Sequence, residues 1–129
     1  MFLYKLIMLI STAFIPLLLI VIGKIFAKYP SKEPNIAIGF RTKLAMTNKE
    51  TWDYAQKLFP IVWINLGRRL LFLSLVTLFL LYSNDNDYTG RLVIIIMLVQ
   101  AALMLASIFY VNLKLKKAFN SDGSRKQIN

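Results

Sequence analysis

The stretch Leu92–Val111, LVIIIMLVQAALMLASIFYV, decides the fold of this chain. It holds twenty residues, and Gln100 is the only strongly polar residue among them. A helix rises ~1.5 Å per residue, so about 20 residues cross the ~30 Å hydrocarbon core of a bilayer. The stretch therefore has the length and the composition of a transmembrane helix.

Two further apolar runs have a similar length, at residues 6–23 and 61–82. The rest of the 129-residue chain is too short to bury three such helices inside a soluble domain. We therefore predict an all-α integral membrane protein, with a single membrane domain over residues 1–129. The three predicted transmembrane helices lie at about residues 6–26, 61–82 and 92–113.

The composition argues against an enzyme. The chain has no His and no Cys, which are the commonest ligands of zinc and haem iron, and its six Asp and Glu residues lie outside the apolar runs. We expect no catalytic residue, no metal and no cofactor. A net charge of +10 and a pI near 10.0 are typical of nucleic-acid binders. Here the charges are scattered beside the apolar runs, so we expect no direct contact with nucleic acid.

The basic residues predict the orientation of the chain. With three spans, the loop 27–60 and the tail 114–129 share one side of the membrane, while Lys5 and Arg91 lie on the other side. The positive-inside rule then places the N-terminus outside and the C-terminus in the cytoplasm. The tail is expected to extend the third helix and then become disordered, and the basic side to contact anionic headgroups. The basic residues of this side are Lys24, Lys28, Lys32, Arg41, Lys43, Lys49, Lys57, Lys114, Lys116, Lys117, Arg125 and Lys126.

The loop 27–60 is much longer than a tight connection between two helices. Thr47 and Glu50 have the spacing of a capping box and predict the start of a short amphipathic helix. This helix would lie in the membrane interface with Trp52 at the depth of the headgroups, and Pro60 would kink it or begin the second span. The alternative is a solvated basic connector that contacts anionic lipid.

The segment 34–59 contains Asn35, Gly39, Phe40, Arg41 and Thr42, followed by Trp52 thirteen residues after the glycine. With these residues at these intervals, it resembles the SdpI/YhfL family of small bacterial membrane proteins. Arg41 and Thr42 offer donors for a carboxylate, a phosphate or a backbone carbonyl, and Gly39 stands where the backbone needs a positive φ or a close approach. In many members a proline and an aromatic residue follow the Arg-Thr pair, and some have a His after the Trp. This chain departs from both patterns.

The resemblance implies an SdpI-like protein of the bacterial cell membrane. Such a protein confers immunity to a membrane-active peptide toxin, or senses it, through the cytoplasmic Gly-Phe-Arg-Thr loop and the membrane helices. The family's best-known member also signals by holding a transcriptional repressor at the membrane. The resemblance therefore implies a peptide toxin or a repressor as partner. The alternative is a holin-like pore former, which is also small, three-spanning and basic at its tail.

Polar residues inside the predicted spans leave two arrangements open. Asn65, Arg68 and Arg69 share one face of the second span, and the arginines either snorkel to the headgroups or form an interior polar cluster. In the second arrangement they would meet Gln100 and Ser107 of the third span.

Small and polar residues elsewhere in the spans give two further expectations. Thr12 lies nearer the outer end of the first span, so we do not expect it to contact the possible polar cluster around Arg68 and Arg69. Ala102 and Ala106 permit the close approach of another helix, either within the chain or in a homodimer.

Overall fold

The computed structural model describes residues 2–32 and 39–126. Within these residues the chain forms three helices, α1 (Phe2–Lys28), α2 (Lys49–Leu81) and α3 (Asn86–Ala118), and no strand. Each helix is long and apolar enough to cross a membrane, so the predicted all-α class and the three predicted spans agree with the structure. The prediction for Asn35 concerns a residue outside the described ones.

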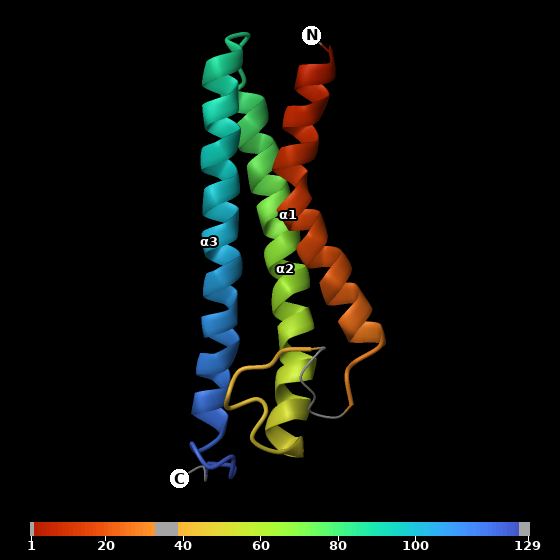
Figure 1. Ribbon diagram of the computed structural model, residues 1–129, viewed down its shortest axis with the longest axis vertical. Helices are drawn as coiled ribbons and strands as arrows, with labels where there is room; N and C mark the ends of the chain where they lie inside the picture. The colour runs from red at the N-terminus through yellow and green to blue at the C-terminus, as the bar shows by residue number, and fades with distance from the viewer. Residues whose placement is uncertain (1, 33–38, 127–129) are drawn as a thin grey trace.

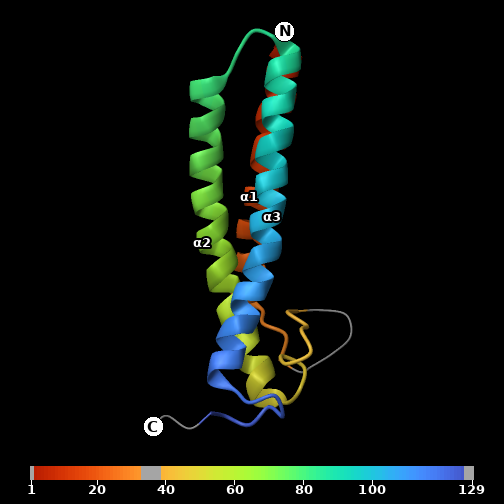
Figure 2. The same ribbon diagram turned by 90° about the vertical axis from the view of Figure 1, so that its left-hand side faces the viewer.

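The helices lie side by side in an elongated bundle (Figure 1). The start of α1 and the connection from α2 to α3 lie at one end, which we call the N-terminal end. The connection from α1 to α2 and the end of the chain lie at the other, which we call the basic end (residues 24–32, 39–60 and 112–126). Figure 2 shows from a second side that the first loop and the C-terminal segment share this end.

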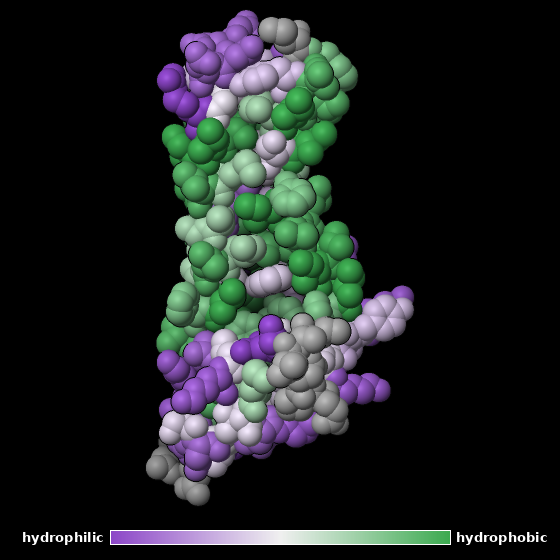
Figure 3. Space-filling view, in the orientation of Figure 1, coloured by the Kyte–Doolittle hydropathy of each residue, from purple (hydrophilic) through white to green (hydrophobic). Residues whose placement is uncertain are grey.

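The outer surface between the two ends is apolar (Figure 3). Large side chains such as Phe79, Phe109 and Leu98 are exposed by 84%, 71% and 65%. Soluble proteins rarely expose a continuous apolar surface of this extent, because its contact with water is unfavourable. The surface instead suits contact with hydrocarbon, and most polar residues in this view lie above and below it.

The structure corrects the prediction of a separate interfacial helix in the first loop. Residues 49–60 are the first turns of α2, which continues through Pro60. The helix is capped by Asn48 rather than Thr47: the Asn48 side chain accepts from the Thr51 N–H at 2.9 Å, and the Thr51 hydroxyl oxygen accepts from the Asn48 N–H at 3.1 Å. Trp52, which was expected to face the headgroups, is fully buried. Its side chain is enclosed by protein.

Two glycines bring α1 and α2 close together. A Cβ atom added to Gly67 would lie 2.8 Å from the carbonyl oxygen of Pro16, and one added to Gly23 would lie 3.1 Å from that of Pro60. Each helix thus presents a glycine to the proline of the other. Ala102 and Ala106, which the sequence suggested for such an approach, are both exposed on α3.

The hydrophobic core lies at the basic end and joins the first loop to α2 and α3. Phe59 is central to it, with ring centroids 5.4 Å from Phe26, 5.8 Å from Phe40 and 5.7 Å from Trp63. The first loop is therefore part of the folded core. The buried members of the core are Phe40, Ala45, Ala55, Phe59, Val111, Leu115 and Phe119.

The C-terminal segment folds back against the start of α2. The Asn48 side chain donates to the carbonyl of Gly123 at 2.8 Å, and Arg125 lies 3.2 Å from the Glu50 carboxylate. The expected disordered end is therefore wrong as far as residue 126. In the same turn, Ser124 donates its hydroxyl and its N–H to the Asp122 carboxylate, and these bonds hold the pKa of Asp122 below its usual value of 3.8.

Candidate functional site

The first loop is fixed to α2 by the side chain of Gln56. Its Oε1 accepts from the Phe40 N–H at 2.9 Å, and its Nε2 donates to the Phe40 carbonyl at 2.8 Å. Both residues are buried, so water cannot reach the Phe40 N–H and carbonyl. The side chain of Gln56 therefore supplies the hydrogen bonds that these buried backbone groups require. Gln56 is not among the residues that the sequence motif indicated. The available signal was its position one turn after Trp52, on the same face of the helix.

Gly39 is required by its conformation and by its neighbours. Its φ of 104° lies in the region that only glycine adopts readily, as predicted. A Cβ atom at this position would lie 2.7 Å from Gln56 Oε1 and 3.3 Å from Trp52 Cη2. The glycine therefore allows the backbone to pass directly over these two side chains.

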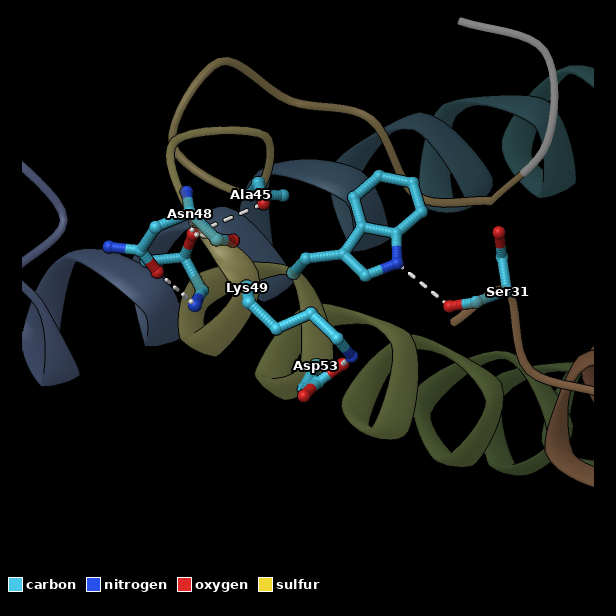
Figure 4. A network of polar contacts seen from close by, with 7 residues as sticks. Ser31, Ala45, Asn48, Lys49 and Asp53 are labelled. Carbon is cyan, nitrogen blue, oxygen red and sulfur yellow. Dashed lines mark hydrogen bonds and ion pairs between the residues drawn. The ribbon is translucent and has the colours of Figure 1, made fainter. Parts of the chain in front are cut away.

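Trp52 connects the end of the α1 segment to α2. Its indole N–H donates to the carbonyl of Ser31 at 2.7 Å (Figure 4). Because Trp52 and Gln56 are four residues apart, one face of α2 holds both Ser31 and Phe40. The chain is thus fastened to α2 on each side of residues 33–38.

Thr42 and Thr51 shape the rest of the loop. The Thr42 hydroxyl accepts from the Ala45 N–H at 3.3 Å, and the Thr42 carbonyl accepts from the Met46 N–H at 3.1 Å. The Thr51 hydroxyl donates to the Ala45 carbonyl at 3.2 Å (Figure 4). Thr42, like Gly39, Phe40 and Trp52, therefore contributes to the fold of the loop.

Arg41 differs from its neighbours in the motif because its side chain is exposed. It stands at a groove of about 370 Å³ that all three helices help to form, which we call the Arg41 groove. Among the described residues that line this groove, Arg41 is the only charged one. The arrangement suits a ligand with an apolar part and an anionic or carbonyl group. The lining residues are Ile22, Phe26, Gly39, Phe40, Arg41, Thr42, Phe59, Trp63 and Ile108.

Gln100 lies at the centre of the bundle with partners that the sequence analysis did not expect. Its Nε2 donates to the carbonyl of Thr12 at 2.9 Å and to the Ser74 hydroxyl at 2.8 Å. Pro16 has no N–H, so the Thr12 carbonyl lacks the donor that a helix normally supplies four residues later. Gln100 supplies that donor from α3. Gln100 therefore meets a backbone group of α1 and Ser74 of α2, rather than the arginines of α2.

The other polar residues of the spans lie away from Gln100. Asn65, Arg68 and Arg69 are exposed on α2. The Ser107 hydroxyl accepts from the Trp63 indole N–H at 2.9 Å. Asn65, Arg69 and Ser107 do share a second groove, between α2 and α3, whereas Arg68 is not among its lining residues.

Comparison with known proteins identifies the family. The model of the SdpI/YfhL protein family matches residues 32–111, from the first loop to near the end of α3. Neither the comparison with curated proteins nor that with solved structures gave a match. The family match covers more than half of the chain, which therefore belongs to the SdpI/YfhL protein family, and its three apolar helices indicate a multi-pass membrane protein.

Proposed function

We propose that this protein protects a bacterial cell against a membrane-active peptide toxin, or senses that toxin, through its Gly-Phe-Arg-Thr loop. Membership of the SdpI/YfhL family suggests a membrane immunity-type protein. The concentration of basic residues at the basic end favours a cytoplasmic loop and C-terminus, with the N-terminus outside. The basic side chains would then lie against anionic headgroups of the cell membrane.

The observation that carries the proposal is the position of Arg41. Its neighbours in the motif hold the loop on α2, and Arg41 itself lines a largely apolar groove. A membrane-active peptide has apolar side chains for such a groove and carbonyl or carboxylate groups for an arginine, which binds a carboxylate through two parallel hydrogen bonds. A cytoplasmic repressor that presents the same groups is the second partner that the site would accept.

The proposal is tested by survival. The gene is expressed in sensitive bacteria, which are then exposed to a set of membrane-active peptides with and without induction. We expect the wild type to protect against at least one peptide and Arg41→Ala to lose protection, because a hydrogen bond to a charged group contributes about 1.5–3 kcal/mol, or roughly 10- to 150-fold in affinity. Arg41→Lys should protect only partly, since it keeps the charge and loses the paired donors.

Lys43→Ala is the matched control for Arg41→Ala. Lys43 is an exposed cation two residues away and does not line the Arg41 groove. Its loss should leave survival unchanged at an equal amount of protein in the membrane. Equal protection by Arg41→Ala and the wild type would contradict a role for the loop. If the gene protects against no peptide, or if induction alone collapses the membrane potential as a holin does, the immunity proposal fails.

A further inference from the structure

The groove between α2 and α3 is lined by polar and apolar residues along its length. We call it the Arg69 groove, and its volume is about 510 Å³. It begins near Tyr110 towards the basic end and extends along the two helices to Arg69 and Leu103. Its lining residues are Val62, Asn65, Leu66, Arg69, Leu103, Ala106, Ser107 and Tyr110.

Arg69 is a charge without an acidic neighbour in this groove. It lies about 12 Å along α2 from Ile61, at ~1.5 Å per residue, within the apolar part of the helix. Among the described residues that line the groove, none is acidic, and α2 has no Asp or Glu after Asp53. An arginine at such a depth is costly unless it finds an anionic or polar partner. The counter-charge for Arg69 must therefore come from outside the groove lining and outside the remainder of α2.

The direction of α2 favours an Arg69 side chain that points towards the basic end, where the headgroups of one membrane leaflet would lie. Helical side chains lean towards the N-terminus of their helix, and α2 begins at the basic end. A side chain at Arg69 with this lean passes over Asn65, which is one turn earlier and lines the same groove. Tyr110 is half-exposed at the edge nearest the basic end, and the ammonium of Lys114 lies 5.6 Å from its ring centroid. The groove thus has Arg69, Asn65 and Tyr110 in its lining and a second cation, Lys114, beside Tyr110.

We propose that the Arg69 groove binds one anionic phospholipid from the membrane leaflet at the basic end. Arg69, Asn65 and the Tyr110 hydroxyl would contact the phosphate, with Lys114 beside it. An acyl chain would lie along Leu66 and Leu103. The Ser107 hydroxyl is already occupied, since it accepts from Trp63 and donates to the Met104 carbonyl. This site is distinct from the Arg41 groove, and it does not depend on the proposed immunity function.

The test is native mass spectrometry of the full-length protein in detergent, titrated with phosphatidylglycerol. We expect one tightly retained lipid, at least tenfold weaker binding in Arg69→Ala, and intermediate binding in Arg69→Lys. Arg68→Ala is the matched control, because it removes the same charge at the same depth from a residue outside the groove. It should change the apparent affinity less than twofold. Leu103→Trp should also weaken binding, since it fills the apolar part and leaves the charge in place.

Several outcomes would overturn the proposal. If Arg68→Ala and Arg69→Ala weaken phosphatidylglycerol binding equally, the arginines attract lipid only through their general positive charge. Equal binding of phosphatidylcholine would exclude selection of an anionic headgroup, and equal retention of inorganic phosphate would exclude a role for the acyl chain. A lipid-free dimer that disappears in Leu103→Trp would show that a second copy of the chain occupies the groove, through the exposed face that holds Ala102 and Ala106. A thermal unfolding measurement in each variant separates loss of binding from loss of fold.

Discussion

The side-chain amide of Gln56 forms hydrogen bonds with both backbone groups of Phe40, as a neighbouring strand would in a β-sheet. The carboxamide has one acceptor and two donors, so it can satisfy an N–H and a C=O at the same time. Gly39 leaves room for this contact, because the Cβ atom of any other residue would collide with the Gln56 amide. The loop therefore depends on an amide and a glycine that are far apart in the chain.

Replacement of Gln56 should loosen the loop. In Gln56→Leu, which has a similar volume, the buried N–H and carbonyl of Phe40 lose their partners at a cost of about 1–3 kcal/mol. We expect the amides of residues 39–46 to exchange hydrogen about 5- to 150-fold faster, as measured by mass spectrometry. Lys57→Leu is the control, because Lys57 is the next residue and is exposed. Equal protection of the loop in both variants would mean that Gln56 does not hold it.

At the scale of elements, α1 and α2 approach through paired glycines and prolines, while α3 is joined to them mainly through side chains. Without a hydrophobic driving force between helices in lipid, small residues favour association because they let backbones come close. Gly67 and Gly23 serve this purpose at two levels of the α1–α2 contact. The exposed small residues of α3 do not contribute to it.

An alanine at Gly67 should separate α1 from α2. Its Cβ would lie 2.7 Å from Ile20 Cγ1 and 2.8 Å from the Pro16 carbonyl oxygen, and a backbone atom cannot move aside without moving the helix. Overpacking of this kind costs about 1–3 kcal/mol, more than the ~1 kcal/mol that alanine gains over glycine in a helix. We therefore expect a net loss of stability in equilibrium unfolding of the protein in detergent.

Gly90→Ala provides the comparison for Gly67→Ala. Gly90 also lies in a helix, but its added Cβ would meet no backbone atom and only the Tyr4 hydroxyl, at 3.0 Å, which donates to the Asn86 carbonyl and need shift only slightly. This variant should be neutral or slightly more stable, by up to ~1 kcal/mol from helix propensity. If Gly67→Ala gains as much stability as Gly90→Ala, then close backbone contact between α1 and α2 does not require a glycine at position 67.

At the scale of the whole molecule, Gln100 joins all three helices. It extends from α3 to the Thr12 carbonyl on α1 and to Ser74 on α2, and its own Oε1 has no hydrogen-bond donor among the described residues. The Thr12 carbonyl is available because Pro16 interrupts the hydrogen bonding of α1. The break in one helix therefore creates the acceptor that fixes another helix against it.

A double-mutant cycle tests this coupling. Gln100→Leu should destabilise the protein by about 1–2 kcal/mol, the range found for hydrogen bonds between membrane helices in model peptides. In the background of Pro16→Ala the cost should be smaller, because the substituted residue supplies the missing N–H to the Thr12 carbonyl within α1. The measurement is the free energy of unfolding of the four proteins in one detergent. Additive effects, with no coupling between the two sites, would contradict this interpretation.

The length and composition of the apolar runs by themselves determined the three helices, since backbone polar groups in hydrocarbon must be satisfied within the segment. The motif residues also indicated the family, and Gly39 its positive φ. The tertiary structure alone decided that Asn48 caps a continuous α2 with no separate helix before it, that Trp52 is buried, and that Gln100 meets the carbonyl of Thr12. The physical reason is that a membrane helix is apolar all around. Its sequence therefore has no periodic pattern that shows which face meets which neighbour, and these contacts depend on how the three helices align in space.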